Sequence, residues 1–146
     1  MRLSDENLKT LLLCIHQVIE QQAERTANQL SEADLTDLVI YPPQGGLTKE
    51  EEQALMQFKS DNNLRTALRK ILADNSASVV FELLKLIDGN AAPDDELGPW
   101  TGVKLVDLEE DSLEEKELLY DNFFETYRKW KIVRPEKGWA LDTVDG

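Results

Sequence analysis

The sequence predicts a mainly α-helical fold, in which residues 1–146 form a single domain of about five helices with a minor β element in residues 102–142. Two observations predict this class. Apolar residues recur at helical spacing through most of the chain, and helix-start and helix-stop signals divide the chain into segments of ordinary helix length. The size agrees, because 146 residues with 41% hydrophobic content are enough to bury one core.

The first helix is predicted from Ser4 to about residue 28. Ser4 precedes two acids, so its side-chain oxygen can accept from unpaired amides while the acids complement the positive end of the helix dipole. If each residue advances about 100° around the axis, one apolar stripe centred near Ile15 holds most of the aliphatic side chains. The stripe consists of Leu8, Leu11, Leu12, Ile15, Val18, Ile19 and Ala23. Leu13 falls nearly opposite, which predicts either exposure or a contact with a second layer or another chain.

A connection is predicted for residues 30–47, because a Pro-Pro pair and a Gly-Gly pair within it stop any regular element. Thr48 with Glu51 three residues later matches a capping box, in which each side chain satisfies the other residue's backbone amide. A short second helix is therefore predicted from Thr48 to about Lys59.

Two further helices are predicted between residues 62 and 87. Asn62 or Asn63 can cap the first, and the stretch at residues 74–76 interrupts it because Asp, Asn and Ser favour caps and turns. The second covers residues 80–87 and ends at Gly89, which suits a left-handed cap. This segment is apolar nearly all round, so it is interpreted as the central buried helix, with a buried strand as the weaker alternative.

The rest of the chain combines a loop, a helix and short strands. Residues 89–101 are a loop by composition, and residues 102–108 could form one strand. Ser112 with Glu115 makes a second capping box, which opens a helix to about residue 130, and the tail can hold two more strands. Together with the stripes of the first helix and of residues 80–87, the aromatic stripe of this helix predicts the core. We therefore expect Leu84 and Phe123 to be buried.

Composition excludes several classes of function. A net charge of −13 repels phosphate backbones, which predicts no direct binding to nucleic acid. One cysteine allows no internal disulfide and fits a reducing compartment, so a cytoplasmic location is expected. The apolar run at residues 11–15 is too short for a signal peptide or a membrane span, which predicts no targeting segment and no membrane partner.

Catalytic motifs are missing from the sequence. Cys14 and His16 are the only residues of their kinds and lie about 200° apart on the first helix, so they cannot form a nucleophile and base pair. No glycine-rich phosphate loop, nucleophile elbow or two-histidine metal motif occurs, and neither a cofactor nor a metal site is predicted. Carboxylates are the groups left for chemistry, and they lie in polar runs that predict full solvation.

Charge is concentrated in one segment. Residues 94–125 hold 12 acids and two bases, which accounts for −10 of the net charge, and residues 128–137 then hold five bases against one acid. A solvated helix face explains this pattern most simply, with cations at the helix end that suits them. A docking surface for a basic partner is the functional interpretation, because one-signed patches speed association. Its candidate residues are Asp94, Asp95, Glu96, Trp100, Glu109, Glu110, Asp111, Glu114 and Phe124.

The leading hypothesis is a non-enzymatic acidic interaction protein that binds a basic protein partner, for example a bacterial immunity protein or an antitoxin. One alternative is an enzyme that uses carboxylates, with or without a divalent metal. Another is a self-associating structural subunit, for which Leu13 and Leu118 would form part of an apolar surface patch. An enzyme should instead bring at least two acids together in a concave pocket.

Overall fold

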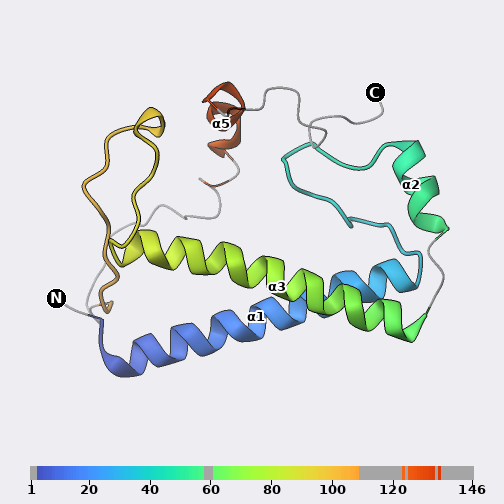
Figure 1. Cartoon of the computed structure of the whole chain (residues 1–146), viewed down its shortest axis with the longest axis horizontal. Helices are drawn as coiled ribbons and strands as arrows, with labels where there is room; N and C mark the ends of the chain where they lie inside the picture. The colour runs from blue at the N-terminus through green and yellow to red at the C-terminus, as the bar shows by residue number, and fades with distance from the viewer. Residues whose placement is uncertain (1–2, 58–60, 109–122, 124, 134, 136–146) are drawn as a thin grey trace. The chain divides into compact units, whose positions relative to one another are not determined.

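A computed structural model describes residues 3–57, 61–108, 123, 125–133 and 135 (Figure 1). Within these residues the fold is mainly helical, as predicted. The described elements are α1 (Asp5–Ser31), α2 (Lys49–Met56), α3 (Asn62–Ile87), the 3₁₀ turn η1 (Asp95–Leu97) and α5 (Tyr127–Val133). No strand occurs among them, and residues 102–108 have no regular structure, so the structure does not support the predicted β element there. The helix predicted from Ser112 is described only at its C-terminal end, where α5 lies. The tail predicted to hold two strands begins at Lys131, but α5 continues through Val133, so the start of that prediction is wrong, and the rest of it falls largely outside the described residues.

The chain divides into two compact units. Unit 1 consists of Met1–Asn28 with Asn62–Leu113, and unit 2 consists of Gln29–Asp61 with Glu114–Gly146. Each unit therefore joins segments that are distant in the sequence. The single domain predicted for residues 1–146 stays a prediction.

The predicted start of α1 is confirmed. The Asn7 amide donates to the Ser4 hydroxyl over 3.3 Å, and the Leu8 amide donates to the Ser4 carbonyl over 2.9 Å. The side chain of Ser4 therefore satisfies one of the amides that an isolated helix start leaves unpaired, and its carbonyl accepts the first bond of the helix. The helix continues to Ser31, slightly beyond its predicted end.

The interruption predicted at residues 74–76 is wrong, because α3 is one continuous helix of 26 residues. The Ser78 hydroxyl donates to the Asp74 carbonyl over 2.9 Å, a bond that Ser can make within a continuous helix. Half-buried aliphatic residues, Leu72 and Val80, flank the stretch on either side. Partial burial of the helix on both sides outweighs the weak turn preference of the polar residues between them. The described part of the chain holds four α-helices rather than about five.

A left-handed glycine ends α3, as predicted. Gly89 has φ +76°, and its amide donates to the Leu86 carbonyl over 3.2 Å. The Asn90 amide donates to the Lys85 carbonyl over 2.9 Å. This pair of bonds is the Schellman motif, which satisfies the last carbonyls of a helix and turns the chain away from its axis.

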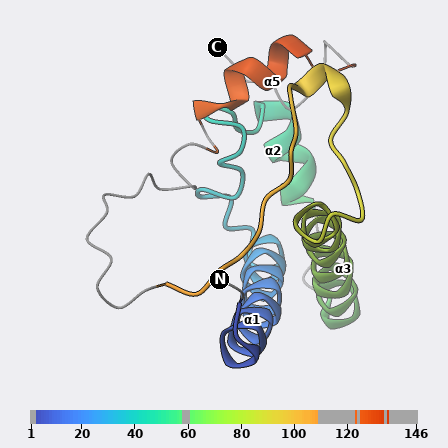
Figure 2. The ribbon, with the colours of Figure 1, turned by 90° about the vertical axis from the view of Figure 1, so that its left-hand side faces the viewer.

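Unit 1 is built on α1 and α3, which lie side by side and run in opposite directions (Figures 1 and 2). Ala23 and Ala27 of α1 are its fully buried apolar residues among those described, with 3% and 0% of their surface exposed. The prediction that residues 80–87 form a central buried helix is wrong, because α3 has no fully buried residue. Leu84 is half-buried. Within the described part of unit 1, α1 is the one α-helix that lies beside α3. A single neighbouring helix covers only one side of α3.

Unit 2 contains α2 and α5. The capping box predicted at the start of α2 is confirmed, because the Thr48 amide donates to Glu51 Oε2 over 2.8 Å and the Glu51 amide donates to Thr48 Oγ1 over 3.2 Å. Tyr41 stacks on Phe123 with ring centroids 5.8 Å apart and meets Tyr127 edge to face at 5.4 Å. Tyr127 is 7% exposed, whereas Phe123 is 59% exposed. The predicted burial of Phe123 is therefore wrong, and Tyr127 takes the buried place among these rings.

Candidate protein-interaction surface

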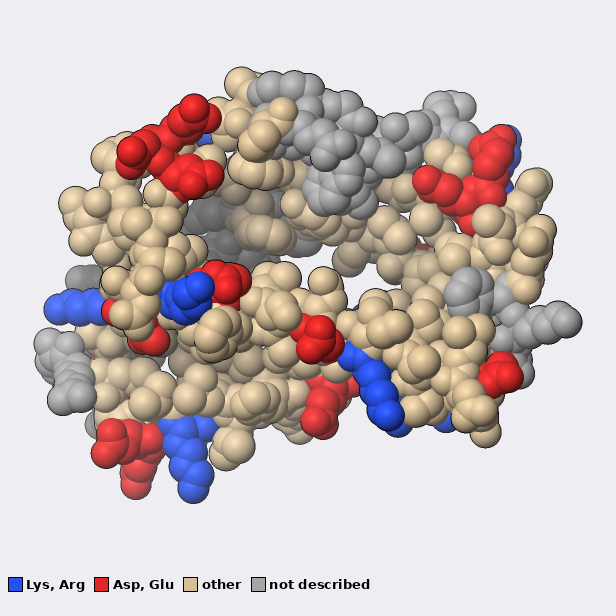
Figure 3. Space-filling view, viewed as in Figure 1, with Lys and Arg blue, Asp and Glu red and all other residues tan. Residues whose placement is uncertain are grey.

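The predicted acidic site is partly described. Asp94, Asp95 and Glu96 are exposed in and beside η1, and Trp100 is 41% exposed a few residues further on. We call residues 94–100 the acidic loop. In the space-filling view, acidic side chains gather at the upper left, over the loop that follows α3 (Figure 3). The other predicted site residues, Glu109, Glu110, Asp111, Glu114 and Phe124, lie outside the described residues.

The acidic loop is shaped by short backbone bonds. The Leu97 amide donates to the Asp94 carbonyl over 3.0 Å, and the Gly98 amide donates to the Asp95 carbonyl over 3.3 Å. Gly98 has φ +134°, a conformation that residues with a side chain rarely adopt. These bonds close one tight turn that carries three successive acidic residues on its surface.

Asp107 connects the segment after the acidic loop to the start of α1. Its carboxylate accepts from the Ser4 amide over 3.0 Å, although the two residues are 103 positions apart in the chain. A hydrogen bond from the Asn7 side chain and this backbone bond hold the pKa of Asp107 below its ordinary value of 3.8. A carboxylate at the N-terminal end of a helix also complements the helix dipole. Asp107 therefore has a structural role at a helix start.

An apolar groove runs between α1 and α3 and was not predicted from the sequence. It encloses about 430 Å³, and Phe81 on its wall is 62% exposed. We call it the α1/α3 groove. Its lining residues are Leu12, Ile15, His16, Ile19, Ala77, Ser78, Val80, Phe81, Glu82 and Leu84. Apolar side chains predominate in this set, which is the usual composition of a binding groove.

A second hollow of about 590 Å³ lies between the N-terminal half of α1, the end of α3 and residues 104–105. Leu12 and Leu84 line this hollow as well as the α1/α3 groove. Its other members are Leu3, Asp5, Leu8, Leu11, Ile87, Asp88, Lys104 and Leu105. The helix interface therefore stays incompletely filled on more than one side of these two leucines.

Charges are sparse in the middle of both helices. Residues 10–23 of α1 contain one charged residue, Glu20, and residues 71–81 of α3 contain one, Asp74. In the space-filling view, surface without Lys, Arg, Asp or Glu predominates along these helices (Figure 3). Several aliphatic side chains of these stretches are about half exposed or more: Leu13, Val18, Ile71 and Val79. Large apolar surfaces of this kind mark interaction sites in soluble proteins.

Two acids, Asp5 and Asp88, line the second hollow. Among the described residues, no three side chains of His, Cys, Asp and Glu come together in a way that could hold a metal ion. His16 lines the α1/α3 groove, whereas Cys14 is exposed and is not part of the lining. The described helices include none that is both long and apolar enough to cross a membrane.

Two sequence patterns indicated surplus apolar surface on these helices, although neither identified the groove and Leu13 does not line it. Leu13 falls off the main stripe of α1, and residues 79–86 are apolar nearly all round. Both patterns indicate more apolar surface than one neighbouring helix can cover. Comparisons with protein-family models, curated proteins and solved structures found no match to this chain.

Proposed function

We propose that this chain is a non-enzymatic interaction protein of the cytoplasm, which binds a basic amphipathic helix of a partner protein. The observation that supports this most is the α1/α3 groove, an apolar surface in a chain of net charge −13. The apolar side of a partner helix would fill the groove, as in other helix-in-groove complexes. The basic side would face a strongly acidic protein.

The acidic side chains near the groove indicate that the partner carries positive charge. The acidic loop belongs to the same compact unit as the groove and presents three exposed carboxylates. Glu82 lines the groove itself and pairs with Lys85 over 3.0 Å. Lys85 Nζ also lies 5.9 Å from the centroid of the Phe81 ring, so this wall already accepts a cation over its aromatic face. Affinity would come from apolar burial, and the acids would accelerate encounter with a basic partner.

An immunity protein or antitoxin of a bacterium is one concrete form of this function. Such a protein would cover the positively charged active site of a nuclease. The high acidity and small size of this chain suit that task. The residues predicted for partner binding keep that role in the proposal.

Paired substitutions on α3 provide the test. Phe81 and Val79 are 62% and 64% exposed, yet Phe81 lines the groove and Val79 does not. The probe is a synthetic helical Leu-Lys amphipathic peptide, with a Leu-Glu peptide of the same pattern as control. Phe81→Ser should weaken Leu-Lys binding about 10- to 100-fold, since burying such a side chain contributes about 1.5–3 kcal/mol. Val79→Ser should change it less than about twofold. Fluorescence anisotropy of labelled peptides measures both.

Salt and charge substitutions test the role of the acids in the same assay. Neutralising Asp94, Asp95 and Glu96 together should slow association and leave dissociation nearly unchanged, because exposed charges act mainly on encounter. Added salt should have the same effect on the parent protein. Equal losses for Phe81→Ser and Val79→Ser, or equal affinity for the Leu-Glu peptide, would contradict the proposal.

Self-association is a second candidate, favoured by Leu13, which is 58% exposed and outside the groove lining. Sedimentation of the parent protein without peptide separates the two functions, because a stable dimer formed through α1 would dissociate in Leu13→Gln. The enzymatic alternative has weaker support. Asp5 and Asp88 line the second hollow, but Asp5 lies in the first turn of α1 and Asp88 follows the last residue of α3. Asp5 complements the positive end of the α1 dipole, and Asp favours caps and turns such as the one that begins at Asp88.

A further inference from the structure

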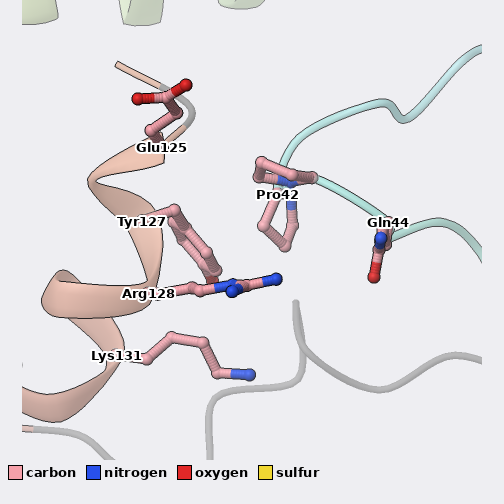
Figure 4. Close-up of a pocket in the computed structure, with 8 residues that line it drawn as sticks. Pro42, Gln44, Glu125, Tyr127, Arg128 and Lys131 are labelled. Carbon is pink, nitrogen blue, oxygen red and sulfur yellow. The ribbon is translucent and has the colours of Figure 1, made fainter. Parts of the chain in front are cut away.

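Unit 2 contains a pocket that is separate in its residues from the surface described above. It encloses about 610 Å³, which lies within the range of about 300–1,000 Å³ usual for small-molecule sites. We call it the α5 pocket. Its lining residues are Pro42, Pro43, Gln44, Gly45, Glu125, Tyr127, Arg128 and Lys131. In the close-up, Arg128 and Lys131 extend from α5 toward Pro42 and Gln44 (Figure 4).

Helix geometry brings the two cations together. Arg128 and Lys131 are three residues apart on α5, and residues at that spacing lie on the same helix face. Lys129 lies between them in the sequence and does not line the pocket. Glu125 contributes a carboxylate, the one acidic side chain among the described lining residues. The described lining of the pocket therefore holds two basic side chains and one acidic side chain in a strongly acidic chain.

The apolar walls are fixed by packing. Pro42 is buried, and Tyr127 is 7% exposed and meets the Tyr41 ring edge to face. The Gly45 amide donates to the Pro42 carbonyl over 2.8 Å, and a Cβ at Gly45 would lie 2.8 Å from that same oxygen. Only glycine fits this turn without a shift of the proline. The turn at residues 42–45, which faces α5, is therefore formed before any ligand arrives, and this reduces the entropy cost of binding.

We propose that the α5 pocket binds an organic anion that carries a carboxylate or phosphate group on an apolar body. The guanidinium of Arg128 can donate two parallel hydrogen bonds to either group, and Lys131 adds a second positive charge. Pro42 and Tyr127 offer apolar contact to the body of the ligand. This binding does not depend on the groove in unit 1.

Three probes test the ligand class on the full chain. Phenylacetate represents the carboxylates, phenyl phosphate represents the phosphates, and benzyl alcohol is the uncharged control. Titration followed by amide chemical shifts should show saturable binding of at least one anion at residues 127–131, with benzyl alcohol at least about tenfold weaker because it lacks the charge-assisted bonds. The anion that binds more tightly shows whether the pocket prefers a carboxylate or a phosphate group. Failure of both anions to saturate, or equal binding of benzyl alcohol, would overturn the proposal.

Three variants of the lining and its surroundings make the test specific. Arg128→Gln should weaken the bound anion about 10- to 100-fold, the loss expected for hydrogen bonds to a charged group. Lys129→Gln is the matched control on the same helix and should change affinity less than about twofold. Glu125→Gln should tighten binding about two- to fivefold, because it removes an exposed like charge beside the ligand. Equal losses in the Arg128 and Lys129 variants would mean nonspecific attraction to a basic helix and would overturn the site.

Discussion

The two ends of the α1/α3 pair differ in how closely the helices pack. At the closed end, where α1 finishes and α3 begins, Ala23 and Ala27 are buried. There Arg65 Nη1 donates to Asn28 Oδ1 over 2.7 Å, and Arg69 lies 3.7 Å from Glu24. At the open end, which comprises residues 8–19 and 77–87, no described side chain is fully buried, and two hollows enter the interface.

Side-chain size explains the difference. Alanines let two helix backbones approach, so a pair of helices can bury them without a third element. Leucines and isoleucines form a wider stripe, and a single neighbour covers one flank of it. On α1, Leu12 and Ile19 on that flank are half-buried, whereas Val18 on the other flank is 47% exposed. The closed end therefore holds unit 1 together, and the open end offers surface for binding.

The largest expected effect is overpacking of the closed end. Ala27→Leu inserts a large side chain at a position with 0% exposure, so the helices must separate. We expect a loss of about 2 to 3 kcal/mol in the free energy of unfolding, measured by urea denaturation. Ala67→Leu on the exposed face of α3 is the control and should change stability by less than about 0.5 kcal/mol. Similar losses at both positions would mean that the two ends do not differ in packing.

A smaller effect is expected at the open end. Leu84 is half-buried and lines both hollows, so Leu84→Ala should cost about 1 to 2 kcal/mol, less than the 2 to 5 kcal/mol typical of a buried leucine. Leu83 is 52% exposed and lines neither hollow, and Leu83→Ala should cost less than about 0.5 kcal/mol. The same urea experiment measures both. A full core-like loss at Leu84 would show that another element covers the open end in solution.

The smallest effect concerns the bond between Asp107 and the start of α1. Because the pKa of Asp107 is lower in the folded protein than its ordinary 3.8, this group stabilises the fold above that value. The contribution disappears as the pH falls through the lower, folded-state pKa. Asn7→Ala removes the largest cause of the shift, so the pKa of Asp107 should rise toward 3.8 in this variant. A carboxyl titration by NMR compares the pKa of Asp107 in the parent protein and the variant. An unchanged pKa would show that the Asn7 side chain does not hydrogen-bond to Asp107.

Local signals predicted the helix starts and stops well. Ser4, the Thr48 and Glu51 box and Gly89 act through bonds to amides and carbonyls within a few residues, which the sequence alone displays. The interruption at residues 74–76 failed because contacts on both sides outweighed a weak preference of Asp, Asn and Ser. Burial at residues 80–87 failed for another reason. Helical spacing shows which side chains are apolar, but it does not show how many neighbours a helix has.

The candidate sites were predictable to different extents. The exposure of Asp94, Asp95 and Glu96 followed from their position in a polar run, and the structure confirms it. The α1/α3 groove required knowledge of which flank of each helix meets the other. The α5 pocket required more, because residues 42–45 and 125–131 come together from distant parts of the chain. The basic residues at 128–137 are visible in the sequence, but the proximity of Pro42 and Pro43 to them is not.

Gly89 decides where the acidic loop points. A Cβ at this position would meet no heavy atom within 4 Å, so space does not demand the glycine, whereas its φ of +76° does. The direction in which the chain leaves α3 therefore depends on one backbone dihedral angle, the φ of Gly89. Gly89→Ala would keep every surface charge in the sequence. It would also disfavour this φ angle and so change the direction in which the acidic loop leaves α3. A partner that contacts both the α1/α3 groove and the acidic loop would then bind more weakly, because the two surfaces would no longer be aligned with each other although each would be unchanged.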